Sequence, residues 1–323
     1  MTDSTAPDSE SSTVSVVLPT YDRPEFLKRA IRSVVEQTYD SIELIVVDDH
    51  SPRPAGPVVQ QFDDSGIDIR YIRHSENRGA NAARNTAIRA TNGEYVAFLD
   101  DDDQWKPTKV EKQVRAFQDT DDDVGVVYTG MECVDSTGNR VYSRMSQSQG
   151  DATTDIFLGV PLTPFSCVMV RSDIIQKAGL LDVEMPSWQD REWYIRLSQH
   201  CQFEVISELL VLRELGEHEQ IGDDFESKRD ISYPLFLSKH RETAAEHGSY
   251  YERRFISSLS ETLARSAIAN NYYTDAIKYS IKSIYFYPKQ VRPYLYLLAS
   301  LGGDLTYKPA TKLYRMISRA NQH

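Results

Sequence analysis

Short apolar runs that alternate with helical stretches are the feature that most restricts how this chain can fold. Val14–Leu18 has the composition of a buried strand, and Pro24 suits the first turn of a helix that extends to Gln37. Other β-rich runs occupy Glu43–Val47, Ile69–Ile72, Tyr95–Leu99 and Val124–Tyr128, and other helical stretches occupy Asn81–Ala90 and Lys106–Phe117. Strands separated by helices of about 10–15 residues predict βαβ units and a parallel sheet.

Two acidic runs lie where predicted strands end. Asp48–Asp49 follows the second apolar run, and Asp100–Asp103 follows the fourth. Ligands bind beyond the carboxyl ends of the strands in such sheets, so both runs are candidates for a binding site. Four adjacent carboxylates repel one another unless water or a cation screens them, and hard oxygen ligands suit Mg²⁺ or Mn²⁺. The alternative is a solvated acidic turn, the class to which Asp121–Asp123 after a predicted helix end is assigned.

The charge balance excludes one large class of function. The 323 residues include 36 Lys and Arg against 48 Asp and Glu, a net charge of -12, whereas nucleic-acid binding requires a basic surface. Asp outnumbers Glu 28 to 20 and Arg outnumbers Lys 24 to 12, a bias that resembles the salt-adapted proteins of halophilic microbes. A hydrophobic content of 40% excludes wholesale disorder.

The cysteines and the chain start indicate a cellular location. The three cysteines are widely spaced and form neither a CxxC pair nor a disulfide framework, which favours the reducing cytoplasm. The first 13 residues are polar and acidic, unlike a signal peptide. Gly159–Val170, the longest weakly polar run, is too short to span a bilayer. We therefore expect a cytoplasmic protein that is soluble or peripheral to the membrane.

Charge also divides the chain into parts. Residues 264–323 carry nine basic and two acidic side chains, so this tail is +7 and the residues before it carry -19. We expect a disordered N-terminus over 1–13, an α/β domain over 14–225 and a helical region over 226–323. The helices expected in the last region are Phe255–Ala269, Thr274–Tyr287 and Pro309–Ala320.

The last of these predicted helices is amphipathic. Its basic and apolar residues fall on opposite faces: Lys308, Lys312, Arg315 and Arg319 against Ala310, Leu313, Ile317 and Ala320. A basic stripe opposite an apolar stripe suits an anionic membrane surface, so the sequence predicts peripheral membrane contact. The alternative is a terminal helix that packs on the protein and leaves its basic face in water.

In the order and spacing of its motifs, the chain resembles the family 2 glycosyltransferases, which have the GT-A fold. The metal motif of that family commonly has the form D-x-D-D-x-W, and residues 100–105 are D-D-D-D-Q-W. Three other segments match: 16–23 the nucleotide loop, with Asp22 where Asn is more usual, 43–51 the base-recognition turn, and 77–85 the loop and helix beside the diphosphate. The resemblance covers about Val14–His218. It implies a GT-A catalytic domain over 14–225, with a Rossmann-like mixed sheet flanked by helices.

The resemblance also implies roles for individual residues. Asp49 would accept the ring N–H of a pyrimidine base, and Asp48 would lie near the ribose. Asp102 would hold a divalent metal, Mn²⁺ or Mg²⁺, with Asp100 as a second ligand. Contacts with the nucleotide sugar are implied for Pro19, Thr20, Tyr21, Arg23, Asp48, Asp49, Gly79, Arg84, Asp100 and Asp101. A divalent cation stabilises the charge that develops on a leaving diphosphate.

A sugar hydroxyl also needs a general base, because it is a poor nucleophile until its proton is removed. The segment Pro186–Leu197 places acidic residues among tryptophans at a predicted helix start. Its pattern alone predicts an amphipathic helix that is capped by Asp190. In the family the catalytic aspartate stands at the head of such a helix, so the resemblance implies that Asp190 is the base. Glu192 is the next candidate, and a supporting role suits it better.

One histidine is a further candidate metal ligand. The family often carries a histidine after a late strand, close to the metal or the diphosphate, and His218 follows the predicted strand Leu209–Arg213. The alternative is an ordinary solvated histidine in a loop.

The resemblance implies an inverting glycosyltransferase that moves a sugar from a nucleotide-diphospho-sugar, UDP-linked, to an acceptor hydroxyl. The expected acceptor is a lipid-linked glycan of the dolichyl-phosphate type at the cytoplasmic face of the membrane, used in protein N-glycosylation or cell-envelope glycan assembly. Two alternatives stay open. A sugar-1-phosphate nucleotidyltransferase would carry a glycine-rich loop after its first strand, but residues 19–24 contain no glycine. The other is a non-catalytic nucleotide-sugar-binding scaffold.

Overall fold

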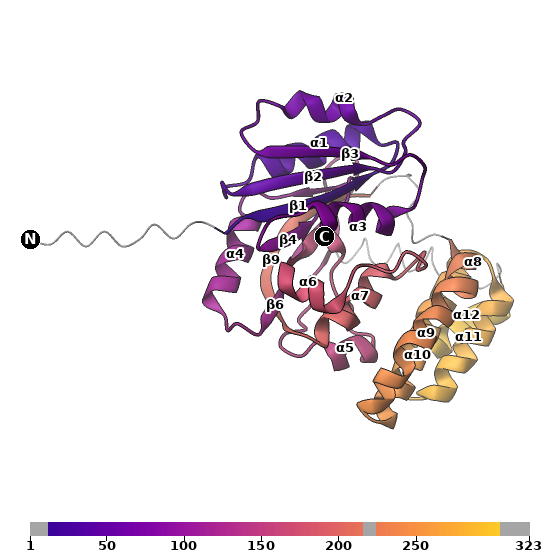
Figure 1. The fold of residues 1–323 in the computed structure, drawn as a ribbon. Coiled ribbons are helices and arrows are strands. Elements are labelled where there is room, and N and C mark those ends of the chain that lie inside the picture. Colours follow the sequence, from indigo (N-terminus) through magenta and orange to yellow (C-terminus); the bar gives the residue numbers. More distant parts are fainter. Residues whose placement is uncertain (1–11, 216–223, 304–323) are drawn as a thin grey trace, which may run out of the picture. The chain divides into compact units, whose positions relative to one another are not determined.

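The computed structural model describes residues 12–215 and 224–303 (Figure 1). The chain forms two compact units. Unit 1 consists of Met1–Ala152, Leu162–Val183 and Arg196–Gly216, and unit 2 consists of Thr153–Pro161, Glu184–Ile195 and Glu217–His323. Among the described residues, no helix has both the length and the apolar character that crossing a bilayer requires.

Unit 1 is built on one nine-stranded sheet, which Figure 1 shows with its helices around it. The strands follow the order β3-β2-β1-β4-β8-β6-β9-β5, and β7 pairs with β6. Their bounds are Val14–Thr20 (β1), Ile42–Asp48 (β2), Asp68–Arg73 (β3), Tyr95–Phe98 (β4), Asp103–Trp105 (β5), Val124–Val134 (β6), Arg140–Arg144 (β7), Val168–Arg171 (β8) and Gln202–Glu214 (β9).

The first half of this sheet is parallel, as the alternation of strands and helices predicts. β1 pairs in parallel with both β2 and β4, and β2 pairs in parallel with β3. Every residue of β1 and β2 is buried, because these continuous apolar runs are covered on both faces. The helices of this unit are Pro24–Val35 (α1), Gly56–Val59 (α2), Ala80–Ala90 (α3), Lys109–Asp119 (α4) and Ser172–Ala178 (α6).

The second half of the sheet is mixed. β8 is antiparallel to β4 and β6, β9 is parallel to β6, and β5 is antiparallel to β9. The predicted strands Val124–Tyr128 and Leu209–Arg213 are therefore the beginning of β6 and the end of β9. The predicted α/β class with a mixed sheet is confirmed.

One helix begins later than predicted. The expected helix from Lys106 starts at Lys109, because Lys106 still belongs to the sheet edge: its backbone N–H donates to the carbonyl of Leu210 at 2.9 Å. Pro107 follows directly, and the residue before a proline is biased away from helical backbone angles.

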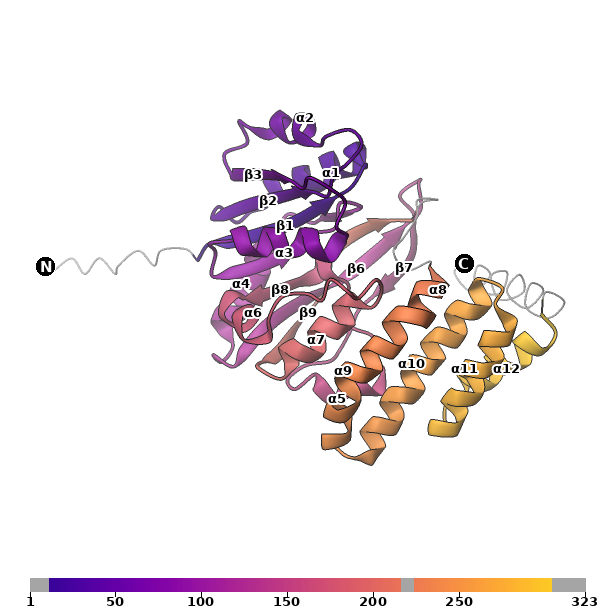
Figure 2. The ribbon, with the colours of Figure 1, turned by 45° about the vertical axis from the view of Figure 1, so that its right-hand side comes forward.

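Unit 2 is helical. Its helices are Thr153–Leu158 (α5), Gln189–Ser198 (α7, whose last three residues belong to unit 1), Phe225–Ser227 (α8), Tyr233–Glu246 (α9), Ser249–Ala269 (α10), Tyr273–Phe286 (α11) and Arg292–Leu301 (α12). Figure 2 shows α9, α10, α11 and α12 side by side. The two predicted helices that begin near Phe255 and Thr274 correspond to α10 and α11. The predicted helix Pro309–Ala320 lies outside the described residues.

Aromatic rings form the core of this unit. Phe157 of α5 meets Phe255 of α10 with ring centroids 5.4 Å apart, and Phe255 meets Phe236 of α9 at 5.7 Å. Trp188, just before α7, lies edge-on to Phe236 at 6.1 Å. Segments far apart in sequence therefore share one core, which fixes the start of α7 against α9 and α10.

Candidate functional site

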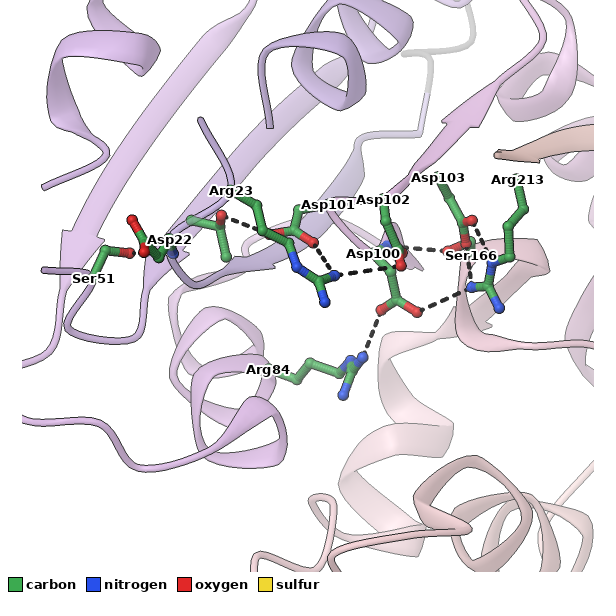
Figure 3. A network of polar contacts seen from close by, with 11 residues as sticks. Asp22, Arg23, Ser51, Arg84, Asp100, Asp101, Asp102, Asp103, Ser166 and Arg213 are labelled. Atoms are coloured by element: carbon green, nitrogen blue, oxygen red, sulfur yellow. Dashed lines mark hydrogen bonds and ion pairs between the residues drawn. The ribbon is translucent and has the colours of Figure 1, made fainter. Parts of the chain in front are cut away.

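The four consecutive aspartates lie at the carboxyl edge of the parallel strands. β4 ends at Phe98, Leu99 continues it, and Asp100–Asp102 form the turn before β5. β1 ends beside this turn at Thr20. The predicted convergence of the strand ends is therefore present in unit 1, and Figure 3 shows the side chains that meet there.

Asp100 lies between two guanidinium groups. Its Oδ1 accepts a hydrogen bond from Arg84 Nη2 at 2.5 Å, and its Oδ2 lies 3.7 Å from Arg213 Nη2. Its backbone N–H donates to Ser166 Oγ at 3.0 Å, which fixes the start of the turn. Burial alone would raise the pKa of Asp100, but the two cations hold that pKa below its ordinary value. Asp100 is therefore ionised and oriented at neutral pH.

Asp101 points toward β1 instead. Its carboxylate accepts a hydrogen bond from Thr20 Oγ1 at 2.8 Å and lies 3.4 Å from Arg23 Nη1. Burial raises the pKa of Asp101 to about 7, and the neighbouring carboxylates act in the same direction. Thr20, Arg23 and Asp101, all predicted to contact the nucleotide sugar, are thus brought together.

Asp103 is fully buried and paired with an arginine that the sequence analysis did not single out. Arg213 of β9 donates from Nε and Nη2 to the two oxygens of Asp103, each at 2.7 Å, across the β5–β9 register. Burial raises the pKa of Asp103 to about 6, against the opposing effect of Arg213. An arginine that ends the apolar run Leu209–Leu212 is the sequence signal that could have identified this pair, because buried charges need partners.

The acidic cluster fits a divalent cation. Asp100, Asp102 and Asp103 each offer one carboxylate oxygen, and these oxygens lie within 4.8 Å of one another. Because Arg213 holds both oxygens of Asp103, Asp102 and Asp100 are the better placed ligands. Two carboxylates with water are a donor set that Mg²⁺ or Mn²⁺ accepts. Arg23 Nη1 lies 3.4 Å from Asp102 Oδ2, so a cation bound there would compete with this arginine.

Asp48 holds the turn that follows β2. Its side chain is fully buried, and it accepts hydrogen bonds from the backbone N–H groups of Ser51 at 2.7 Å and Ala55 at 2.9 Å. The hydroxyl of Tyr71 donates to it at 2.7 Å. Although burial raises its pKa, these donors bring the pKa of Asp48 below its ordinary value. Asp48 therefore organises this turn, and its role beside the ribose stays a prediction.

Asp49 holds the loop before α3. Its Oδ1 accepts from the backbone N–H of Arg78 at 2.9 Å and lies 2.7 Å from His74 Nδ1, while its Oδ2 accepts from the N–H of Gly79 at 2.7 Å. The other ring nitrogen of His74 lies 2.9 Å from Thr86 Oγ1 of α3. Gly79 has a φ of 86°, a conformation that favours glycine. His74, which the sequence analysis did not name, is thus a direct neighbour of Asp49, the residue predicted to bind the nucleotide base.

The loop after β1 completes this edge of the sheet. Pro19 is buried within β1, whereas Tyr21 is 46% exposed. Asp22 has a φ of 50°, and its backbone N–H donates to Ser51 Oγ at 2.9 Å. Asparagine and aspartate are the non-glycine residues that tolerate this conformation best, which explains why either can occupy the position.

The predicted base, Asp190, belongs to unit 2. It lies in the first turn of α7 and accepts a hydrogen bond from the backbone N–H of Arg191 at 2.7 Å. The expectation that Asp190 caps this helix is wrong. The helix begins one residue earlier, at Gln189, and the carbonyl of Trp188 accepts the first helical hydrogen bond, from Glu192 N–H at 2.9 Å. Trp188 has a φ of 63°, so the chain turns sharply just before the helix.

The two residues that follow Asp190 in α7 contact other helices of unit 2. Arg191 donates from Nη2 to the carbonyl of Ile156 at 2.8 Å and to Ser258 Oγ at 3.0 Å, and burial lowers the pKa of Arg191 to about 10. Glu192 Oε1 lies 3.2 Å from His240 Nε2 in the interior. A buried glutamate with a histidine neighbour suits the supporting role expected for Glu192. The start of α7 is thereby anchored on α5, α9 and α10.

His218 and the basic stripe from Lys308 to Arg319 lie outside the described residues, so both stay predictions.

Comparison with known proteins identifies the fold and the family. The family model described as glycosyl transferase family 2 matches residues 15–179. An uncharacterized glycosyltransferase of Methanocaldococcus jannaschii is 27% identical over 68% of this chain and 77% of its own length. TuaG of Bacillus subtilis, named for teichuronic acid biosynthesis, is 30% identical over 55% of this chain and 68% of its own length.

Two solved structures share the architecture. The crystal structure of S. aureus TarS 1-349 in complex with UDP-GlcNAc has a TM-score of 0.57 at 19% identity and covers 85% of this chain and 89% of its own. A mannosyltransferase from Pyrobaculum calidifontis, in complex with GDP-Man and Mn²⁺, has a TM-score of 0.53 at 15% identity over 97% of this chain and 81% of its own. These similarities confirm the predicted GT-A fold with a helical C-terminal region.

Proposed function

Because the chain belongs to glycosyl transferase family 2, we propose that it transfers a sugar from a nucleotide-diphospho-sugar to an acceptor hydroxyl with inversion at the anomeric carbon. The observation that carries this proposal is the arrangement at the carboxyl edge of unit 1. There Asp100 and Asp102 offer neighbouring oxygens, Thr20 and Arg23 face the same turn, and Asp49 fixes the next loop.

The residues at the carboxyl edge of the sheet would have different roles in binding the donor. Arg84 orients the carboxylate of Asp100, and Arg213 keeps Asp103 out of the ligand set. Asp102 and Asp100 would hold Mn²⁺ or Mg²⁺, which when bound stabilises negative charge on the leaving nucleotide diphosphate. Tyr21 is exposed enough to line the nucleoside. The proposed roles of Pro19, Gly79 and Asp48 are to shape the backbone around it.

Asp190 is our proposed general base. It would accept the proton of the acceptor hydroxyl as the hydroxyl oxygen attacks the anomeric carbon and the bond to the diphosphate breaks. Its place in the first turn of α7, on a helix held by buried contacts of Arg191 and Glu192, supports this assignment. A base must be held within hydrogen-bond reach of the proton it removes, and a rigid helix start provides such positioning.

The proposed donor is UDP-linked. TarS, whose fold this chain shares, binds UDP-GlcNAc, whereas the mannosyltransferase from Pyrobaculum calidifontis binds GDP-Man with Mn²⁺. An acidic residue at position 49 can accept the ring N–H that uracil, thymine and guanine each offer, so the choice of UDP follows from the likeness to TarS. We further propose that the acceptor is a lipid-linked glycan at the cytoplasmic membrane face, used in N-glycosylation or envelope assembly. The name of TuaG, which refers to an envelope polymer, is consistent with the second of these.

The alternatives receive less support. A sugar-1-phosphate nucleotidyltransferase would require a glycine-rich loop after β1, and residues 19–24 contain no glycine. A non-catalytic scaffold would not need carboxylates that are oriented as closely as Asp100 and Asp102.

A thermal-shift panel tests the donor site without knowledge of the acceptor. The melting temperature is measured with UDP, GDP and dTDP, each with and without Mn²⁺, at high salt. We expect a metal-dependent rise with UDP, because ligands that bind the native state raise its stability. The variant Asp102→Ala should lose the metal-dependent part of that rise. The exposed Asp122→Ala, in the other acidic run, is the matched control and should keep it.

The thermal-shift results test the identity of the nucleotide separately from the existence of a donor site. A rise with GDP or dTDP alone would overturn the proposed nucleotide and retain the donor site. No rise with any nucleotide would overturn the donor site itself.

A further inference from the structure

The last described helix, α12, turns its apolar side to the solvent. Val291, Leu295, Leu298 and Leu301 are 68%, 57%, 64% and 66% exposed, and Tyr294 is 40% exposed. Their spacing places them on one face of a helix. The buried side chains of α12 are Pro293 and Ser300, on the opposite face. The helix is thus amphipathic in the reverse of the usual sense: Pro293 and Ser300 are packed, whereas three of its leucines, Leu295, Leu298 and Leu301, face the solvent.

This face lies at the end of a helical layer. α12 packs on α11 and α10, and Figure 2 shows it at the far end of the row that begins with α9. Monomeric soluble proteins rarely expose contiguous apolar patches of this kind, and such patches mark sites that bind protein or membrane. Leucines at three successive turns therefore require a partner of matching apolar character.

The residues around this apolar face carry a net positive charge, which favours an anionic partner. Residues 270–303 carry four cations and one carboxylate, although the whole chain is -12. The carboxylate, Asp275, is 3.1 Å from Arg229 Nη1. Arg292, next to the apolar face, lies 3.8 Å from Glu261 Oε1 through Nη1, yet its side chain is 75% exposed, and Lys289 just before it is exposed as well. Beyond Gly303 the sequence has the same sign, with Lys308, Lys312, Arg315 and Arg319.

We propose that the apolar face of α12, bordered by Lys289 and Arg292, binds the surface of a membrane that contains anionic lipid. Leucines enter the boundary between headgroups and acyl chains, and the flanking cations contact lipid phosphates. Tyr294 suits the headgroup level, where aromatic side chains with a polar tip gather. A pairing of two copies through this face would bring no acidic side chain of residues 289–303 against these cations, whereas anionic lipid supplies the opposite charge. The proposal goes beyond donor binding and does not depend on it.

Vesicle co-sedimentation of the full chain tests the proposal. The probes are vesicles of phosphatidylcholine alone and of phosphatidylcholine mixed with phosphatidylglycerol. We expect binding to the mixed vesicles only, and weaker binding as salt rises. The double variant Leu295→Ser/Leu298→Ser should lower the bound fraction on the order of tenfold or more, because less apolar area enters the lipid. The matched control Val141→Ser/Val183→Ser changes exposed residues of unit 1 and should bind like the unchanged chain.

Three results would overturn the proposal: equal binding of the double variant and the unchanged chain, equal binding to neutral and anionic vesicles, or no binding to either. If light scattering instead reveals a dimer without lipid that the double variant dissociates, the face is an interface between copies. The UDP-dependent thermal shift of the double variant should match that of the unchanged chain. Failure of membrane binding is therefore distinguishable from failure of the donor site.

Discussion

At the scale of single residues, the pair of Asp103 and Arg213 determines which carboxylates remain for ligands. We expect Arg213→Met to lower the free energy of unfolding by about 3–5 kcal/mol, because it leaves a fully buried carboxylate without its guanidinium partner. Urea unfolding measures this loss. The Mn²⁺-dependent thermal shift should not fall, because removing a cation that lies 3.7 Å from Asp100 strengthens the attraction of the remaining carboxylates for a metal.

A partly exposed ion pair between α1 and β9 supplies the control. Arg29 Nη1 lies 2.6 Å from Glu214 Oε2 with both side chains partly exposed, so Arg29→Met should cost about 0–1 kcal/mol. The double variant Asp103→Asn/Arg213→Met should recover part of the lost stability. A loss in Arg213→Met no larger than that in Arg29→Met would contradict the importance of this pair.

The proposed base has a separate test. Asp190→Asn should lower turnover by on the order of 10²–10⁴, since proton abstraction is lost, while the donor-induced thermal shift stays unchanged. Glu192→Gln should instead act on stability, because Glu192 contacts His240 in the interior. Turnover of Asp190→Asn close to that of the unchanged chain would remove Asp190 from the mechanism.

A buried lysine makes stability depend on pH. Burial lowers the pKa of Lys109 to about 7 from its ordinary 10.5, while its Nζ donates to Gln113 Oε1 at 2.6 Å. Between these two values the unfolded chain binds more protons than the folded chain, so stability should rise with pH, by at most about 1.4 kcal/mol per unit. Urea unfolding from pH 7 to 10 should show a flatter profile for Lys109→Met. The partly exposed Lys112→Met is the control and should keep the rise.

The sequence allowed the acidic residues to be placed but not their partners. Asp100–Asp103 follow an apolar strand, which is enough to predict that they gather at a sheet edge. Which of them can bind a metal depends on Arg84, which bonds Asp100, and on Arg213, which bonds Asp103, and neither arginine is adjacent to them in sequence. Pairings of this kind arise from tertiary structure, so no local pattern reveals them. The cap assigned to Asp190 was wrong because the chain turns sharply at Trp188, which lies edge-on to Phe236, and the helix begins directly after that turn.

At the scale of elements, the contact between β1 and β4 leaves no room for a side chain at Gly93. A Cβ there would lie 2.6 Å from the carbonyl oxygen of Thr13 and 2.8 Å from the backbone nitrogen of Ser15. Gly93→Ala should therefore cost about 1–3 kcal/mol, because backbone must shift and the start of β1 moves away from β4. Gly56→Ala, whose nearest neighbour would be the Tyr71 ring at 3.3 Å, should cost less. Thermal unfolding compares them, and equal costs would contradict this reading of the strand contact.

Long regular elements were predictable, whereas short or atypical ones were not. The periodic runs that became β1, β2, α3 and α10 carry strong apolar signals. β5 has three residues, one of them an aspartate, and exists because β9 supplies its hydrogen-bonding edge. α12 exposes Leu295, Leu298 and Leu301, so its pattern gave no sign of which face packs. Propensity identifies a segment's conformation, and only its neighbours determine its orientation.

At the scale of the whole molecule, the net charge of -12 opposes the folded state. Like charges crowd together on folding, and dissolved salt screens their repulsion. We expect the melting temperature to rise as KCl is increased from low to high concentration. Replacing KCl by an uncharged osmolyte of equal osmolality separates screening from solvent exclusion, which also stabilises folded proteins. A melting temperature that is flat or falls with KCl would contradict this expectation.

The chain crosses between the two units five times, after residues 152, 161, 183, 195 and 216. Neither unit is therefore a continuous stretch that a ribosome completes before starting the other. A fragment that stopped near residue 225 would contain α5 and α7 but not α10, so Phe157 would lack Phe255 and the guanidinium of Arg191 would lack Ser258. The packing of α5 and of the start of α7 therefore depends on helices that are synthesised later. Until they emerge, the start of α7 lacks the contacts with α9 and α10 that hold it.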